Sequence, residues 1–214
     1  SVFYLSAQPR GRLLDVGCGT GRMMKRLARL GWMVQGIDFD PKAVGVARSE
    51  GLTVGLGSLD EQDFEDNSFD AVVMSHVIEH VADPRALLMS CKRVLKPGGQ
   101  LVSVTPNASS WGHRLYLADW YGLDPPRHLH IFTSEALTKL AEDVSFSRLS
   151  VSSVIANAHG ILWSSNELKY RDKAGPYLFS VRSQLWGRAM QMVEWSRLLF
   201  NPYSGEEIVL HAIK

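Results

Sequence analysis

Apolar runs of strand length alternate with amphipathic runs along most of this chain. The first run of strand length, residues 13–16, is apolar except for Asp15 and leads into a turn with glycine at every second position, Gly17, Gly19 and Gly21. From Met24 onward, apolar or small residues recur at i, i+3, i+4 and i+7, with lysines and arginines on the other face. The run at residues 13–16 predicts a buried strand, and the helical spacing of apolar residues from Met24 onward predicts a helix. Together they predict the strand, tight turn and helix that open a nucleotide-binding α/β sheet.

The same alternation continues to the end of the chain. Helix starts are marked by Asp40-Pro41, Asp83-Pro84 and Thr133-Ser134, and Lys96-Pro97-Gly98-Gly99 marks a helix end. Further strands are predicted at residues 33–39, 52–58, 70–75, 100–105, 146–156 and 207–214. We therefore predict an α/β fold, a Rossmann-like seven-stranded and mostly parallel sheet with helices on both faces.

Almost fifty residues, 157–204, separate the last two predicted strands, where a short hairpin would suffice. This segment reads as helical and carries half of the tryptophans, with six lysines and arginines against three acids. Connections of this length are usually functional or carry their own secondary structure. We expect one domain, residues 1–214, with a helical cap inserted at 157–204 that forms a mobile lid over the acceptor. Its cations suit either an acidic acceptor or a peripheral contact with anionic lipid. The alternative is that these helices pack permanently on the sheet or form a dimer interface.

Composition narrows the class of protein. Apolar residues make up 45% of the 214 residues and the net charge is +1, which predicts no nucleic-acid partner. Two cysteines, Cys18 and Cys91, are too few for a disulfide framework, so we expect a cytoplasmic location. The sequence has no apolar run of membrane-spanning length. Because the chain starts at Ser1 close to its first strand, we expect an N-terminal segment to be missing.

The glycine-rich turn carries the first chemical signal. Glycine lets the backbone turn sharply and lets a ligand lie against it. A dinucleotide fingerprint needs glycine at the sixth position of the turn, and that position is Arg22. Asp38 ends the second predicted strand, about twenty residues later, where an acid accepts hydrogen bonds from a ribose diol. These residues predict a nucleoside ligand.

The GxGxG spacing, with Asp15 two residues ahead of it, resembles motif I of the class I S-adenosylmethionine (SAM)-dependent methyltransferases. The string PN…W…DPPRHLHIFTSEAL resembles their small-molecule branch, related to ubiquinone-pathway O-methyltransferases and to sugar and glycan methyltransferases. This resemblance implies SAM as cofactor and makes the last strand antiparallel at the sheet edge. It implies cofactor contacts from ten residues: Asp15, Gly17, Gly19, Gly21, Asp38, Phe39, Ser58, Leu59, Ser75 and His76. Many members carry Asp where this chain has Ser58, so the adenine contact stays open among Ser58, Leu59 and Asp60.

Methyl transfer to a hydroxyl needs a group that takes its proton. An imidazole titrates near neutrality, so His128 and His130 are candidate bases, and His76 is a third. Related sugar C-methyltransferases carry His at the position of His128, preceded by Glu where this chain has Arg127. The resemblance implies a small-molecule acceptor, a sugar or quinone-like hydroxyl, that enters under residues 107–130 and the 157–204 cap. Metal-ligand spacings are missing from the sequence, so we expect no metal.

Three other interpretations remain open. An NAD-dependent oxidoreductase would also use an acid at the position of Asp38, but it would have glycine where this chain has Arg22. In a non-catalytic SAM-binding or membrane-associated protein, the 157–204 segment would be the functional part and no histidine would act as a base. An RNA or protein methyltransferase is disfavoured by the low net charge and by the lack of an amine-methylating Asn/Asp-Pro-Pro-aromatic motif.

Overall fold

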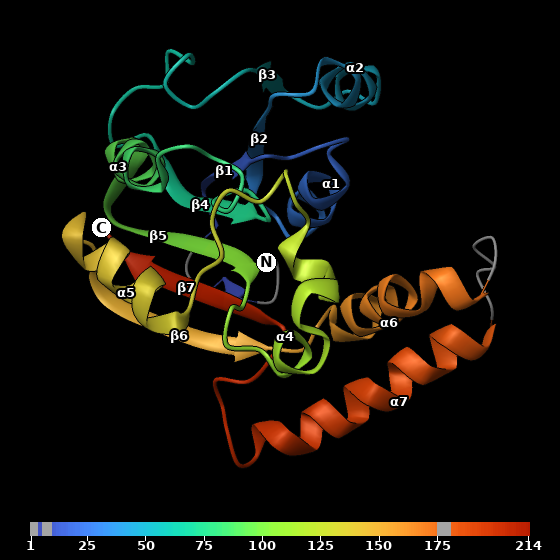
Figure 1. Ribbon diagram of the computed structural model, residues 1–214. Coiled ribbons are helices and arrows are strands. Elements are labelled where there is room, and N and C mark those ends of the chain that lie inside the picture. The colour runs from blue at the N-terminus through green and yellow to red at the C-terminus, as the bar shows by residue number, and fades with distance from the viewer. Residues whose placement is uncertain (1–3, 6–9, 175–180) are drawn as a thin grey trace. The chain divides into compact units, whose positions relative to one another are not determined.

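The computed structural model describes residues 4–5, 10–174 and 181–214. Seven strands form one sheet in the order β3-β2-β1-β4-β5-β7-β6 (Figure 1). The strands are β1 (Arg12–Val16), β2 (Met33–Asp38), β3 (Val54–Leu56), β4 (Phe69–Ser75), β5 (Leu95–Pro106), β6 (Ser147–Val154) and β7 (Glu207–Ile213). The α-helices are α1 (Arg22–Arg29), α2 (Pro41–Ser49), α3 (Pro84–Val94), α4 (Trp111–Tyr116), α5 (Ser134–Asp143), α6 (Ala158–Ala174) and α7 (Val181–Leu198). The Rossmann-like, mostly parallel α/β sheet and the helical insertion before the last strand are confirmed.

Most of the sheet is parallel. β1 pairs with β2 and β4, β2 with β3, and β4 with β5, all in parallel register. β7 runs against β5, since the Gly98 amide donates to the Lys214 carbonyl and the Asn107 amide to the Glu206 carbonyl. The expectation that the last strand is antiparallel is right, but its place at the sheet edge is wrong. β7 lies between β5 and β6, and β6 is the edge strand.

β5 begins earlier than the sequence predicts. Leu95 already pairs with Phe69, and pairing resumes where Gln100 meets Ala71. The partner strand therefore advances by two residues while β5 advances by five, and the Lys-Pro-Gly-Gly run bulges out between them. This run does not separate the helix from its strand, because α3 ends at Val94 and β5 follows at once.

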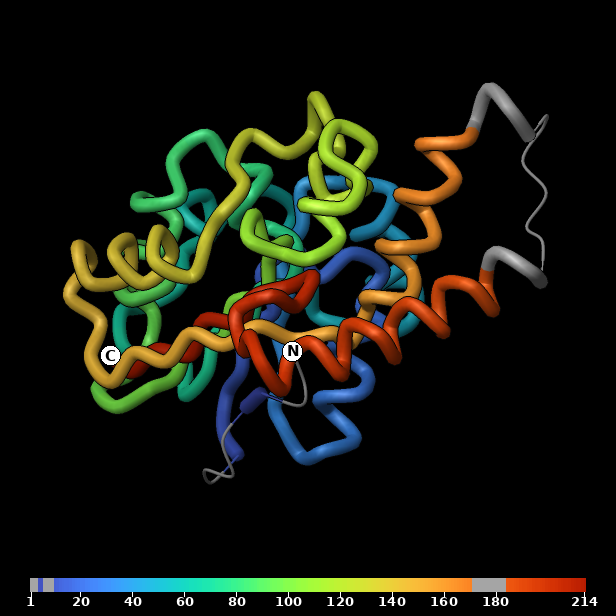
Figure 2. The backbone as a smooth tube through the Cα atoms, turned by 60° about the horizontal axis from the view of Figure 1, so that its bottom comes forward, coloured from blue at the N-terminus to red at the C-terminus, as the bar shows by residue number. Residues whose placement is uncertain are grey.

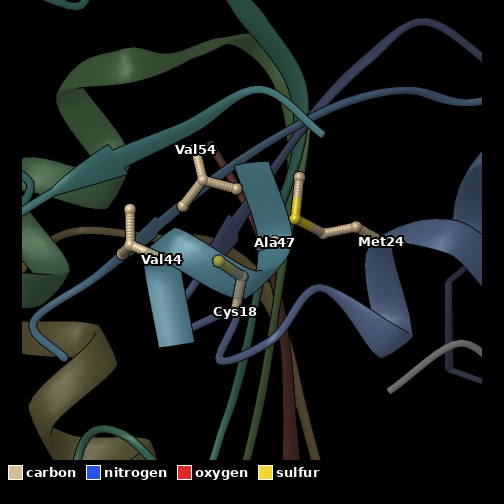
Figure 3. Close-up of a cluster of buried hydrophobic side chains, with 5 residues drawn as sticks. All are labelled: Cys18, Met24, Val44, Ala47 and Val54. Carbon is tan, nitrogen blue, oxygen red and sulfur yellow. The ribbon is translucent and has the colours of Figure 1, made fainter. Parts of the chain in front are cut away.

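The chain divides into two compact units, and the first comprises residues 1–104, 138–150 and 210–214. Its buried side chains include the cluster Cys18, Met24, Val44, Ala47 and Val54 (Figure 3). This cluster fills the space between the glycine-rich turn, α1, α2 and β3. Both cysteines, Cys18 and Cys91, are buried and free.

The second unit comprises residues 105–137 and 151–209. α6 and α7 lie side by side as a helical pair (Figures 1 and 2). The 107–132 segment packs against α6 through a buried hydrophobic cluster. Its buried members are Tyr116, Trp120, Ala158, Ile161 and Leu162. Among the described residues, no helix is long and apolar enough to cross a membrane. The chain is described as these two compact units, and its assignment as a single domain remains a prediction.

Candidate functional site

A cavity of about 620 Å³ lies in the first unit, at the carboxyl ends of β1, β2 and β4. Six residues predicted to touch the cofactor line it: Gly17, Asp38, Phe39, Ser58, Leu59 and His76. Asp15, Gly19, Gly21 and Ser75, the other four, are not among the lining residues. The volume falls within the range of about 300–1,000 Å³ typical of small-molecule sites.

The glycine-rich turn forms one wall of this cavity. Gly17 has a φ of +71°, and a Cβ added there would lie 2.4 Å from Val77 Cγ2. Gly19 has a φ of +54°, with no atom within 4 Å of an added Cβ. The amides of Gly17 and Cys18 both donate to the Ile37 carbonyl, at 2.8 and 3.0 Å. The turn is therefore fastened to β2 and leaves open space at Gly19.

Asp38 connects β2 to the same turn. Its Oδ2 accepts a hydrogen bond from the Gly19 amide at 2.7 Å, and its Oδ1 accepts one from the Asp40 amide at 2.9 Å. Each carboxylate oxygen can accept more than one hydrogen bond, so both oxygens keep capacity toward the cavity. The two backbone donors fix the orientation of the carboxylate before any ligand arrives.

Asp15 lies beneath the turn and is 4% exposed. Its Oδ2 is buried without a hydrogen bond among the described residues. Burial, and then the negative charge of Asp38, raises the pKa of Asp15 to about 7. A buried carboxyl oxygen in this state is an acceptor that a ligand or a water can satisfy.

Ser58 is engaged by its own turn. Its amide donates to Glu61 Oε2 at 2.6 Å, and its hydroxyl accepts from the Glu61 amide at 3.3 Å. Asp60 also lines the cavity, and its Oδ1 accepts from the Ser90 hydroxyl at 2.5 Å. The cavity wall at this point therefore presents Leu59 and Asp60 besides Ser58.

His76 leaves β4 with a φ of +56° and faces the cavity. Its Nδ1 lies 3.2 Å from Oε1 of Glu79, which is completely buried. The Glu79 carboxylate therefore braces the imidazole from inside the unit. His80 lines the cavity as well.

Comparison with known proteins adds to this geometry. Residues 2–151 match the family described as Methyltransferase domain. The chain is 33% identical over 168 residues to the ubiquinone biosynthesis O-methyltransferase of Cereibacter sphaeroides, a span of 73% of this chain and 68% of the relative. The chain belongs to the SAM-dependent methyltransferases.

Two further comparisons are consistent with this family. The ubiquinone biosynthesis O-methyltransferase of Xanthomonas oryzae is 45% identical over 114 residues, 49% of this chain and 48% of the relative. The chain thus spans about half the length of that relative. A phosphoethanolamine N-methyltransferase of Haemonchus contortus, solved with SAM, shares the fold at a TM-score of 0.66 and 21% identity, over 99% of this chain and 50% of that one.

SAM is the cofactor of this methyltransferase, and the first unit suits it. The open space at Gly19 admits a ligand against the backbone, and Asp38 offers oriented carboxylate oxygens at the same place. The unsatisfied Oδ2 of Asp15 lies beneath the same turn. These observations favour a nucleoside bound along the glycine-rich turn.

His128, the first candidate base, belongs to the second unit. Its Nδ1 lies 2.7 Å from the Gly122 carbonyl, and since a carbonyl only accepts, Nδ1 carries the proton. Its Nε2 lies 3.9 Å from Oδ2 of Asp124, which also pairs with Arg127. His130 stacks at a tilt on Phe132, with 5.9 Å between ring centroids. The two histidines therefore differ, because His128 has a defined tautomer whereas His130 has an aromatic contact.

The residue that organises the second unit was missed from the sequence. Glu206 is completely buried and accepts from the Gly112 amide at 2.6 Å, Trp120 Nε1 at 2.7 Å and the Ser110 hydroxyl at 3.3 Å. Asn107 donates to the carbonyls of Tyr203 and Gly205 next to it. Glu206 ends a run of small and polar residues directly before β7, and such a run in the sequence does not indicate a buried hydrogen-bond acceptor.

Proposed function

We propose that this methyltransferase moves the methyl group of SAM to a hydroxyl of a small-molecule acceptor, a sugar or a quinone-like ring. The observation that carries the proposal is the hydrogen bond of His128 Nδ1 to the Gly122 carbonyl. It leaves Nε2 as the basic nitrogen of the neutral ring. The O-methyltransferase relatives support oxygen as the acceptor atom.

When bound, SAM would supply a methyl group on a positively charged sulfur. The acceptor oxygen would bond to the methyl carbon as the carbon–sulfur bond breaks, and the sulfur would leave as a neutral thioether. His128 Nε2 accepts the hydroxyl proton as the new oxygen–carbon bond forms, and it becomes an imidazolium. Oδ2 of Asp124, at 3.9 Å, stabilises that positive charge by attraction. General-base assistance of this kind contributes roughly 10²–10⁴-fold to a rate.

The cofactor roles of the first unit are part of the same proposal. Asp38 would accept hydrogen bonds from the ribose hydroxyls, and the backbone at Gly17 and Gly19 would lie against the ligand. Leu59 would pack on the adenine, and Ser58 or Asp60 would meet its polar edge. Phe39, which is 64% exposed, would cover the nucleoside. His76, braced by Glu79, and Ser75 would hold the methionine part.

Asp15 and Gly21, the other two residues of the glycine-rich turn region, act on the turn itself. Asp15 acts on the turn from below, through its buried carboxyl group. Gly21 serves the packing of the turn.

We also propose a cytoplasmic location, which the two free, buried cysteines support, since disulfides are rare in reducing compartments.

His128→Asn tests the base. The Asn amide can still donate to the Gly122 carbonyl but offers no basic nitrogen. With SAM and a panel of a catechol, a hydroquinone and a nucleotide-linked sugar, we expect wild type to form an O-methyl product. We expect His128→Asn to lower turnover at least tenfold, with SAM affinity by calorimetry unchanged.

His130→Asn is the matched control. A loss confined to His130→Asn would transfer the base to that residue. A methyl group found on nitrogen or carbon would overturn the hydroxyl assignment. Tight SAM binding with no transfer to any acceptor would favour the non-catalytic interpretation.

A further inference from the structure

α7 exposes an apolar stripe on the side that faces away from α6. Leu185 and Met192 are seven residues apart and so share a face, and Trp195 lies three residues further along. Leu199 and Phe200 follow directly after the helix, which ends at Leu198. Leu185, Met192, Trp195, Leu199 and Phe200 are 59%, 73%, 61%, 70% and 90% exposed. We call these five residues the outer α7 stripe.

The opposite side of α7 already has its partners. Trp186 and Met190 pack on the buried cluster that contains Ile161 and Leu162 of α6. Both views show α7 against α6 on one side, with no other described element of the same unit across its outer side (Figures 1 and 2). A helix that is apolar on both sides is usually covered on both. The outer stripe is thus a surface that fits a partner.

The exposed charge beside the stripe is positive. Arg188 is exposed and precedes Met192 by four residues, so the two share a side of α7, whereas Glu194, the only acid between residues 184 and 203, is completely buried. Arg197 is exposed too, but it follows Met190 by seven residues and lies over the Trp111 ring, with 5.3 Å from its guanidinium carbon to the ring centroid, so it belongs to the opposite side. An exposed apolar stripe that carries an arginine and no exposed acid complements a surface with an apolar interior and negative headgroups.

We propose that the outer α7 stripe docks on an anionic lipid bilayer. A helix that lies in the membrane interface buries an apolar face and keeps arginines at the headgroups. Tryptophan prefers that interface, which suits Trp195. A second copy of the chain fits less well, because a two-fold contact places the same patch against itself and adds a second Arg188 with no exposed acid of the stripe to pair with it.

Vesicle flotation tests this proposal in the absence of SAM and acceptor, so its outcome is independent of methyl transfer. We expect the protein to float with phosphatidylcholine vesicles that contain about one third phosphatidylglycerol, at least tenfold more than with pure phosphatidylcholine. About 0.5 M salt should release it, since headgroup attraction is screened. Arg188→Gln should weaken binding about fivefold.

Two glutamate substitutions separate the stripe from general surface effects. Met192→Glu with Leu199→Glu should abolish flotation, while Val46→Glu, on the exposed side of α2 at 45% exposure, should leave it unchanged. Urea unfolding of each variant shows whether it is folded. Absence of flotation by wild type, or equal loss in Val46→Glu, would overturn the proposal. So would a wild-type dimer in solution that the double variant turns into a monomer, because the stripe would then be a self-interface.

Discussion

Asp38 and Asp40 are two residues apart and have different tasks. Asp38 accepts the Gly19 amide and faces the cavity, whereas Asp40 accepts the Lys42 amide and caps α2 from an exposed position. The first links the end of β2 to the glycine-rich turn, and the second satisfies a backbone amide in the first turn of α2. The pair therefore provides its own control.

Asp38→Asn should weaken SAM binding at least tenfold in calorimetry. The amide keeps the size of the side chain but loses the charge that strengthens hydrogen bonds to hydroxyls, each worth about 1.5–3 kcal/mol. Asp40→Ala should lower the free energy of unfolding by about 1 kcal/mol and leave SAM affinity unchanged. Equal losses of SAM affinity in both variants would contradict a ribose role for Asp38.

Between elements, the glycine-rich turn packs closely against α2 and the residue Leu52 that follows it. A Cβ at Gly21 would lie 2.1 Å from Leu52 Cδ1 and 3.5 Å from Ala47 Cβ, and the residue has a φ of +77°. This glycine is required by packing and backbone conformation at once. Gly45, inside α2, has no atom within 4 Å of an added Cβ.

Gly21→Ala and Gly45→Ala should therefore have opposite signs. Gly21→Ala should lower the free energy of unfolding by more than 1 kcal/mol, because φ is positive and Leu52 must move. Gly45→Ala should raise it by about 0.5–1 kcal/mol, because alanine loses less entropy in a helix. Urea unfolding of both variants checks this, and a stabilised Gly21→Ala would show that the turn tolerates a side chain.

The sequence predicted the elements whose signals are local. The β1–turn–α1 unit follows from period and glycine spacing, and the Asp83 cap with Pro84 marks the start of α3 as observed. The start of β5 escaped, because its bulge is decided by pairing with β4. The burial of Glu79 escaped as well, since a carboxylate beside two histidines reads as a surface residue until its neighbours are known. The six cavity-lining residues were predicted from a resemblance to a family. Such a resemblance predicts the residues of a cofactor-binding turn better than it predicts the chemical identity of the methyl acceptor.

At the scale of the whole molecule, a group of carboxyl groups is buried around the start of β7. Glu194 and Glu206 are both completely buried, and Glu207 is 1% exposed, with Asn157 donating to it. Burial, and then the neighbouring charge of Glu206, raises the pKa of Glu194 far above its usual 4.5. Burial raises the pKa of Glu206 too, while donors from Trp120 and Gly112 oppose the shift. Glu194 is therefore the member that holds a proton at neutral pH.

Stability should fall as pH rises. Because the folded state holds a proton on Glu194 that the unfolded chain releases near its ordinary pKa, this stabilisation is complete below about pH 4.5 and is lost as pH rises through the raised value. The slope is at most about 1.4 kcal/mol per pH unit. Unfolding in urea between about pH 6 and about pH 9 should show a smaller loss for Glu194→Gln than for wild type. Glu65→Gln, an exposed change, should keep the wild-type slope, and a Glu194→Gln slope equal to wild type would assign the effect to other groups, such as Asp15.

Glu206 accepts hydrogen bonds from residues far earlier in the chain, and this has a practical consequence for experiments that exchange acceptor preference between relatives. Segment 107–132 is the natural piece to transplant, yet its Trp120 indole and Gly112 amide both end on a carboxylate some ninety residues later in the chain. A chimera that imports this segment without the matching start of β7 leaves two buried donors unpaired, at about 1–3 kcal/mol each. Recombination libraries should therefore treat 107–132 and 203–207 as one inherited block.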